Sequence, residues 1–137
     1  TGVQTCALPI CGRLHRGLRA IPLTGFAAAR SAVANDQGEA LEYAQLVAAL
    51  GRPGDVLVGV STSGNAANVC NAAKVARATG MDVLALTGPE GGRLTSLSTC
   101  CIRTPGESTA RVQELHLPIY HAVCRALEAG FFGGERR

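Results

Sequence analysis

Residues 55–65 read D-V-L-V-G-V-S-T-S-G-N, an apolar run that ends in a polar loop. The continuous aliphatic stretch Asp55–Val60 predicts a strand that is buried on both faces. The loop Ser61–Asn65 supplies three hydroxyl groups, and Gly64 allows the backbone to turn tightly. A helix is predicted to follow the loop, and the unpaired N–H groups of its first turn favour an anion at the same place.

The same loop fits a second interpretation. Ser63 or Asn65 could simply cap the following helix by accepting hydrogen bonds from its first N–H groups. The spacing matches neither of the common nucleotide-binding loops, G-x-x-x-x-G-K-[ST] and G-x-G-x-x-G, so no nucleotide cofactor is expected. The residues alone therefore leave a phosphate site and an ordinary helix cap both open.

Strands and helices alternate on either side of this stretch. Such an order predicts parallel βαβ units with right-handed crossovers, and so an α/β fold in which helices flank a mainly parallel sheet as a three-layer sandwich. A turn is predicted over 35–38, and Gly130 is expected to end the last helix. The hydrophobic periodicity predicts strands over 19–24, 55–60, 82–87 and 100–103, and helices over 39–50, 66–79, 93–97 and 108–129.

Composition narrows the functional class. A chain of 137 residues with 47% hydrophobic residues can form one compact domain. A net charge of +3 without a basic run does not favour nucleic-acid binding. No apolar stretch reaches the roughly 20 residues that span a bilayer, so no membrane segment is expected. The six cysteines fit neither a C-x-x-C pair nor a zinc-finger spacing, and we expect reduced thiols in a cytoplasmic protein.

The chain ends are expected to lie outside the domain. Residues 1–10 show no clear period and resemble a non-native leader, so native residues before Cys11 are expected to be missing. We expect one partial domain over 11–130 and a loose tail over 131–137.

Two motifs in order carry a family resemblance. The stretch G-D-V-L-V-G-V-S-T-S-G-N is followed by a helix and then by D-V-L-A-L-T-G-P-E-G-G, which resembles the sugar isomerase (SIS) domain. The segment A-R-V-Q-E-L-H at 110–116 resembles R-I-Q-E-x-H of the phosphoheptose isomerase branch. The resemblance covers residues 12–129 and implies a homo-oligomer, commonly a tetramer. The implied activity is the ketose–aldose isomerisation of sedoheptulose 7-phosphate in heptose biosynthesis.

The resemblance assigns roles to two groups of substrate-binding residues. It implies that Ser61, Thr62 and Ser63 bind the substrate phosphate, and that Asn35 and Asp36 lie near the sugar. From the residues alone, a turn-forming pair is the preferred interpretation of Asn35 and Asp36.

The long last helix is implied to supply two further active-site residues. Gln113 and His121 are implied to line the site and to ligate a zinc ion, with His121 as the acid–base catalyst. A group that titrates near neutrality suits proton transfer between neighbouring carbons. The alternative for His121 is a structural hydrogen bond.

The sequence also departs from the family pattern. Ala66 stands where the family often has Ser, which removes one hydroxyl. The family's C-G-N-G-G-S loop, and the helix after it that carries a catalytic Glu, do not occur. We therefore expect residues 1–137 alone to have no isomerase activity. Two non-enzymatic readings stay open: a replication-initiator-associated regulator and a phosphosugar-sensing module of a regulatory protein.

Overall fold

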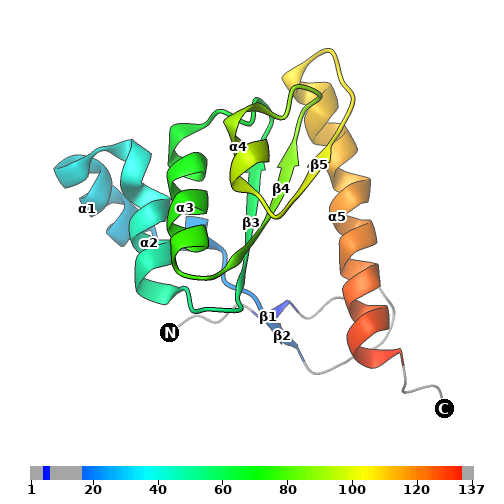
Figure 1. The fold of residues 1–137 in the computed structure, drawn as a ribbon, viewed down its shortest axis with the longest axis horizontal. Helices are drawn as coiled ribbons and strands as arrows, with labels where there is room; N and C mark the ends of the chain where they lie inside the picture. The colour runs from blue at the N-terminus through cyan, green and yellow to red at the C-terminus, as the bar shows by residue number, and fades with distance from the viewer. Residues whose placement is uncertain (1–4, 7–16, 134–137) are drawn as a thin grey trace. The chain divides into compact units, whose positions relative to one another are not determined.

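The computed structural model describes residues 5–6 and 17–133 of the chain (Figure 1). The described residues fall into two compact units, one of residues 23–115 and the other of residues 5–6, 17–22 and 116–133. The unit of residues 23–115 holds the parallel sheet and most of the predicted site, and it is described first.

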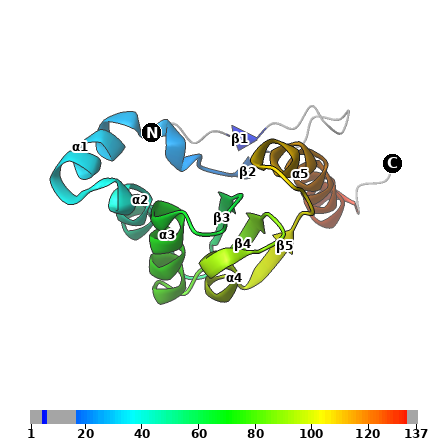
Figure 2. The same cartoon turned by 90° about the horizontal axis from the view of Figure 1, so that it is seen from above.

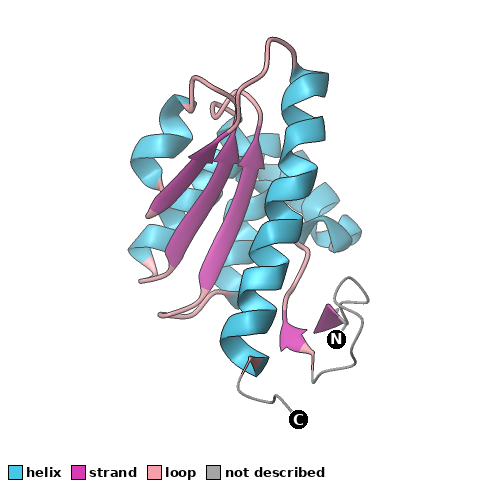
Figure 3. Ribbon diagram, turned by 90° about the vertical axis from the view of Figure 1, so that its right-hand side faces the viewer, coloured by secondary structure: helices cyan, strands magenta, loops and turns pink. Residues whose placement is uncertain are grey.

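This larger unit alternates strands with helices as predicted. Its sheet contains three parallel strands in the order β3-β4-β5, and Figure 3 shows all three running in one direction. The predicted bounds of β4 and β5 are confirmed, and β3 lies one residue further along the chain than predicted. The elements are α1 (Ala27–Gln37), α2 (Glu42–Leu50), β3 (Val56–Ser61), α3 (Ala67–Ala78), β4 (Asp82–Thr87), α4 (Gly92–Leu97) and β5 (Cys100–Arg103), with short 3-10 turns at Leu23–Gly25 and Glu39–Leu41.

The core of the unit lies between the sheet and α3. Figure 2 shows α3 and α4 on the same side of the strands, with α1 and α2 beyond α3. The buried residues of α3 are small, which lets the helix lie close to the strands. A side chain at Gly59 would come within 3.1 Å of the Val69 side chain, so a larger residue at this point of β3 would push against α3. The buried residues of α3 are Cys70, Ala72, Ala73 and Ala76.

The prediction that this strand is buried on both faces is wrong for β3. Val56, Val58 and Val60 each stay more than half exposed, while Leu57 and Gly59 face α3 and α4. The reason is position: β3 is an edge strand of the three-stranded sheet, whereas β4 lies in its centre and is largely buried.

Two further predictions are corrected in the first part of the chain. The predicted strand over 19–24 is absent: only Leu18–Arg19 (β2) is extended, and a 3-10 turn follows at Leu23–Gly25. The predicted turn over 35–38 begins too early, because α1 continues to Gln37. Gly38 ends the helix at φ 94°, and its N–H donates to the carbonyl oxygen of Ala34.

The other unit contains a two-residue antiparallel pairing and most of the last helix. Thr5–Cys6 (β1) pairs with β2. Helix α5 (Thr109–Phe132) begins in the larger unit, and Pro118 lies inside it. The helix passes through Gly130 and reaches Phe132, because Gly130 keeps a negative φ. Residues 131 and 132, which were expected to belong to a loose tail, are therefore helical.

The leader expected over 1–10 lies outside the described residues except for β1, and so does the tail over 134–137. The four cysteines whose side chains the structure describes, Cys70, Cys100, Cys101 and Cys124, are free thiols, as predicted. None of the helices in the described ranges combines the length and the apolar character needed to cross a bilayer.

Candidate functional site

The candidate site is the edge of the sheet at which the three parallel strands end. Ser61, Thr87 and Arg103 are the last residues of their strands, and they lie in register across the sheet. The loops that follow β3 and β4 therefore meet at this edge (Figure 3). In open α/β sheets, ligands bind at the carboxyl ends of the strands.

The loop after β3 is a tight turn that only glycine completes. The N–H of Gly64 donates to the carbonyl oxygen of Ser61 at 2.9 Å, and Gly64 has a φ of +64°. A side chain at Gly64 would collide with the carbonyl oxygen of Gly91 and would lie 2.9 Å from the nitrogen of Gly92. Two backbones thus touch at this point, one from each loop.

The loop after β4 locks onto the first loop through backbone hydrogen bonds. The N–H of Gly88 donates to the carbonyl oxygen of Thr62 at 2.8 Å, and the N–H of Leu94 donates to that of Gly64 at 2.9 Å. Gly91 and Gly92 have positive φ angles of 72° and 56°. The two glycines thus supply the left-handed backbone of this loop, and they also allow the close contact between the loops.

Asn65 holds the two loops together and does not cap α3. Its side-chain oxygen accepts from the N–H of Arg93 at 3.0 Å, and its side-chain nitrogen donates to the carbonyl oxygen of Ser63 at 3.1 Å. The guanidinium of Arg93 donates a hydrogen bond to the carbonyl oxygen of Asn65 at 2.9 Å. Both polar atoms of the Asn65 side-chain amide are therefore hydrogen-bonded within the protein. Its oxygen accepts from the first turn of α4 and not from that of α3.

The three hydroxyl groups of the loop differ in their partners. Ser63 Oγ accepts from the N–H of Asn65 at 3.1 Å, which leaves its own proton free to donate. Across residues 17–133, no hydrogen bond involves the hydroxyl group of Ser61 or of Thr62. Ser61 is only 8% exposed and Thr62 is half-buried. The loop thus presents three hydroxyl protons, two of them on groups without a partner in the described part of the chain.

The start of α3 adds backbone donors beside the hydroxyls. Ala66 stands at the N-cap position, and no side chain caps the helix. The first backbone bond of α3 runs from the N–H of Cys70 to the carbonyl oxygen of Ala66. No protein acceptor in the described ranges takes the N–H groups of Ala67 and Asn68. Such open donors, together with the positive end of the helix dipole, favour an anion.

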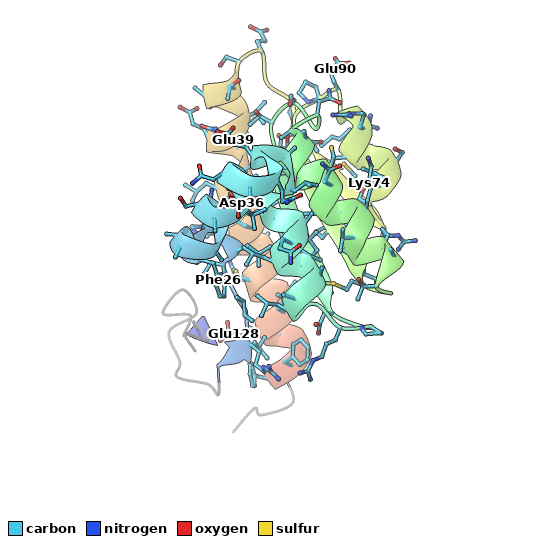
Figure 4. All side chains as sticks on the ribbon, turned by 90° about the vertical axis from the view of Figure 1, so that its left-hand side faces the viewer. Phe26, Asp36, Glu39, Lys74, Glu90 and Glu128 are labelled. Carbon is cyan, nitrogen blue, oxygen red and sulfur yellow. The ribbon has the colours of Figure 1, made fainter. Side chains whose placement is uncertain are left out.

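The predicted sugar-binding pair lies on a different element. Asn35 and Asp36 belong to the last turn of α1, where both side chains are exposed; Figure 4 labels Asp36 on the surface of this helix. Neither side chain makes a hydrogen bond to the loop after β3. The structure therefore leaves both side chains open to a ligand, and it does not bring them together with the loop.

The two predicted active-site residues of the last helix fall in different units. Gln113 is exposed in the first turns of α5, within the larger unit, and His121 lies half-buried in the other unit. The ring of Tyr120 meets the ring of His121 edge-on, with 5.2 Å between the centroids. No group of three His, Cys, Asp or Glu side chains close enough to hold a metal ion occurs in the described part of the chain. The ligands described here therefore do not form a complete zinc site.

One polar cluster next to the loop was not predicted from the sequence. Glu42 is buried at the start of α2 and accepts hydrogen bonds from Arg30 of α1 and Asn68 of α3. A signal was present in the sequence: Glu42 adjoins Leu41 in a helix whose neighbouring positions are apolar. A charged residue next to a buried face often marks a paired, buried group.

Comparison with known proteins gives a consistent result. The family model described as "SIS domain" matches residues 14–88, a range that includes the loop after β3 and the Asn-Asp pair. A phosphoheptose isomerase of Thiobacillus denitrificans is 45% identical over 122 residues, which are 87% of this chain and 62% of the relative. A phosphoheptose isomerase of Akkermansia muciniphila is 38% identical over 134 residues, which are 96% of this chain and 71% of the relative.

Solved structures agree with the sequence relatives. The phosphoheptose isomerase GmhA of Neisseria gonorrhoeae superposes with a TM-score of 0.80 at 42% identity, covering 82% of this chain and 63% of that one. That of Francisella tularensis gives a TM-score of 0.78 at 38% identity, covering 81% and 60%. The chain thus spans about three fifths of the length of several relatives that it matches. The predicted fold class, a mainly parallel sheet flanked by helices, is confirmed. The chain belongs to the SIS-domain family and, within it, to the phosphoheptose isomerase branch.

Proposed function

We propose that the loop after β3 and the first turn of α3 bind the phosphate group of a sugar phosphate. The observation that carries this proposal is the set of open donors at one sheet edge: the hydroxyls of Ser61 and Thr62 and the N–H groups of Ala67 and Asn68. A phosphate ester offers only acceptor oxygens, so a site made of donors matches it. Ser63 can add a third hydroxyl.

Neutral donors are sufficient for this role. Hydrogen bonds to a charged group contribute about 1.5–3 kcal/mol each, roughly twice as much as neutral ones. The dipole of α3, which is 12 residues long, adds a favourable potential at its N-terminus. Ala66 lacks the hydroxyl that the family often has here, so phosphate affinity rests on the remaining donors.

For the whole protein we propose a ketose–aldose isomerase acting on sedoheptulose 7-phosphate. Its named relatives are phosphoheptose isomerases. The reaction moves a proton between two neighbouring carbons, and another between their oxygens. His121 is proposed to exchange one of these protons, and Gln113 is proposed to orient the substrate by hydrogen bonding. The exposed amide of Asn35 and the exposed carboxylate of Asp36 are proposed to bind sugar hydroxyls.

Zinc stays a prediction that involves Gln113 and His121. Two ligands do not complete the three protein ligands of a catalytic zinc site, so we assign no step to a metal. When bound, zinc would supply Lewis-acid polarisation of the substrate oxygens. Equilibrium dialysis of the purified chain against zinc tests whether the described residues suffice, and we expect weak binding at most.

We also propose that the protein is a homo-oligomer, expected to be a tetramer, and that it acts in the cytoplasm. An exposed apolar stripe on α5 supports self-association, because its members recur at helical spacing on one face. The stripe consists of Leu117, Tyr120, Leu127 and Phe131. Sedimentation of the purified chain tests this interface.

Calorimetric titration with inorganic phosphate and with sedoheptulose 7-phosphate tests the binding proposal. We expect both ligands to bind. Thr62→Val should lower both affinities by about tenfold or more, because one hydrogen bond to the charged phosphate is lost. Thr95→Val is the matched control, since Thr95 lies on α4 and is exposed. Equal affinities for the wild type and Thr62→Val would contradict the proposed site. We expect no turnover by residues 1–137, and measurable isomerisation by this chain would overturn that expectation.

A further inference from the structure

The polar cluster centred on Glu42 joins three helices through one carboxylate. Glu42 is only 8% exposed, and both of its oxygens are used. Oε2 accepts from Arg30 Nε of α1 at 2.9 Å, and Oε1 accepts from Asn68 Nδ2 of α3 at 3.0 Å. A buried carboxylate is costly unless it is paired, and here two donors from separate helices supply the pairing.

On the α1 side, the cluster is the most specific attachment of the helix. No residue of α1 is buried, so little apolar surface fixes its position. Arg30 contacts Glu42, donates to the carbonyl oxygen of Thr24 at 3.3 Å, and lies with its guanidinium carbon 4.9 Å from the ring centroid of Tyr43. Directional contacts of this kind fix the helix in angle as well as in place. The same helix carries Asn35 and Asp36 about one and a half turns further along.

On the α3 side, the cluster determines which backbone donors are left for a ligand. A carboxylate can only accept, so Glu42 requires the NH₂ group of the Asn68 side chain to face it. The oxygen of the same amide then faces the helix and accepts from the N–H of Val69 at 2.9 Å. The third N–H of α3 is therefore occupied, while those of Ala67 and Asn68 stay open.

We propose that Glu42 is a positioning residue that fixes the phosphate-binding turn of α3 and the sugar-binding end of α1 relative to one another. It acts through Asn68 and Arg30 and touches no substrate. This inference rests on the proposed function, since it assumes a ligand with a phosphate at α3 and hydroxyl groups at α1. Glutamine can replace it only in part, because its amide oxygen accepts but its amide nitrogen cannot accept from the second donor.

Two single substitutions separate the two halves of the cluster. Asn68→Leu removes the contact with α3. We expect it to lower the affinities for inorganic phosphate and for sedoheptulose 7-phosphate by a similar factor of about three to ten. Arg30→Met removes the contact with α1. We expect it to lower only the affinity for the sugar phosphate, by a similar factor, and to leave the affinity for inorganic phosphate unchanged. Glu42→Leu removes both contacts and should lower the affinities for both ligands. Glu42→Gln keeps the shape but offers one acceptor, and it should lie between the wild type and Glu42→Leu.

Arg77→Met is the matched control, because Arg77 forms an exposed ion pair with Asp82 at 3.8 Å. It should leave both affinities unchanged. A different effect of Arg30→Met on the affinities for the two ligands distinguishes a positioning role from a general loss of structure. A general loss of structure would lower both affinities in every variant. If Glu42→Leu does not fold, the two half-cluster variants still give this difference.

The outcomes separate this inference from the proposed function. If the wild type binds both ligands and Glu42→Leu binds them equally well, the positioning role is wrong and the phosphate site stands. Equal weakening of both ligands by Arg30→Met also overturns it. If the wild type binds neither ligand, the proposed function fails, and the role of Glu42 fails with it.

Discussion

Helices α1 and α3 are similar in length and both rich in alanine, yet they are held in different ways. Helix α3 has 12 residues, four of them buried in the core, while α1 has 11 residues and buries none. Ala72, Ala73 and Ala76 of α3 are buried in the core, where their small size allows close packing. No alanine of α1 is buried, and the helix is attached through Arg30 and its contacts with Glu42 and Tyr43.

The difference matches the roles proposed for the two helices. A phosphate group is rigid, so the turn that binds it gains from a fixed position, and apolar burial supplies that for α3. The hydroxyl groups of a sugar chain vary in direction, so residues that bind them can lie on a helix held by a few polar contacts. Polar attachment is weaker and more local than core burial, and such segments lie at the low-stability end of a fold.

The largest effect is expected at the contact between the two loops that anchor α3. Gly64→Ala should lower the free energy of unfolding by roughly 2–5 kcal/mol, because it adds a left-handed alanine and a collision with the backbone of Gly91. Gly54→Ala is the matched control: Gly54 has a φ of +86°, but nothing lies within 4 Å of an added side chain. It should cost only about 1 kcal/mol. Urea unfolding gives both values, and equal losses would show that the loop contact contributes nothing.

A smaller effect is expected from enlarging one alanine on each helix. Ala76→Leu should destabilise by about 1–3 kcal/mol, because Ala76 is fully buried against the core. Ala32→Leu on the exposed side of α1 should change stability by less than about 0.5 kcal/mol. Thermal unfolding of both variants measures the difference. If Ala32→Leu lowers the free energy of unfolding as much as Ala76→Leu, then Ala32 is packed against its neighbours and α1 is not held mainly by polar contacts.

The sheet was predictable because its signals are local and agree with one another. The bounds of β4 and β5 follow from short apolar runs between turn residues, and β3 differs by one residue. The exposure of one face of β3 was not predictable, since a run of valines does not reveal whether its strand lies at the centre or the edge of a sheet. The turn predicted over 35–38 falls largely inside the end of α1, because Asn35 and Asp36 are turn formers, whereas Gly38 alone supplies the positive φ that ends the helix.

The candidate site was predictable in type but not in detail. The three hydroxyls and the helix start follow from the sequence of the loop after β3. The role of Asn65 did not, because its partner Arg93 lies 28 residues away. The cluster around Glu42 escaped prediction for the same reason: Arg30 and Asn68 are 12 and 26 residues from it. Such contacts depend on tertiary packing, which single-chain periodicity does not encode.

Amide NMR of the isotope-labelled chain, titrated first with inorganic phosphate and then with sedoheptulose 7-phosphate, tests the phosphate site most directly. We expect phosphate to shift the amide signals of Ala67 and Asn68 and to leave those of Asn35 and Asp36 in place, and we expect the sugar phosphate to shift all four. Phosphate-induced shifts confined to other surfaces, with Ala67 and Asn68 unchanged, would contradict it.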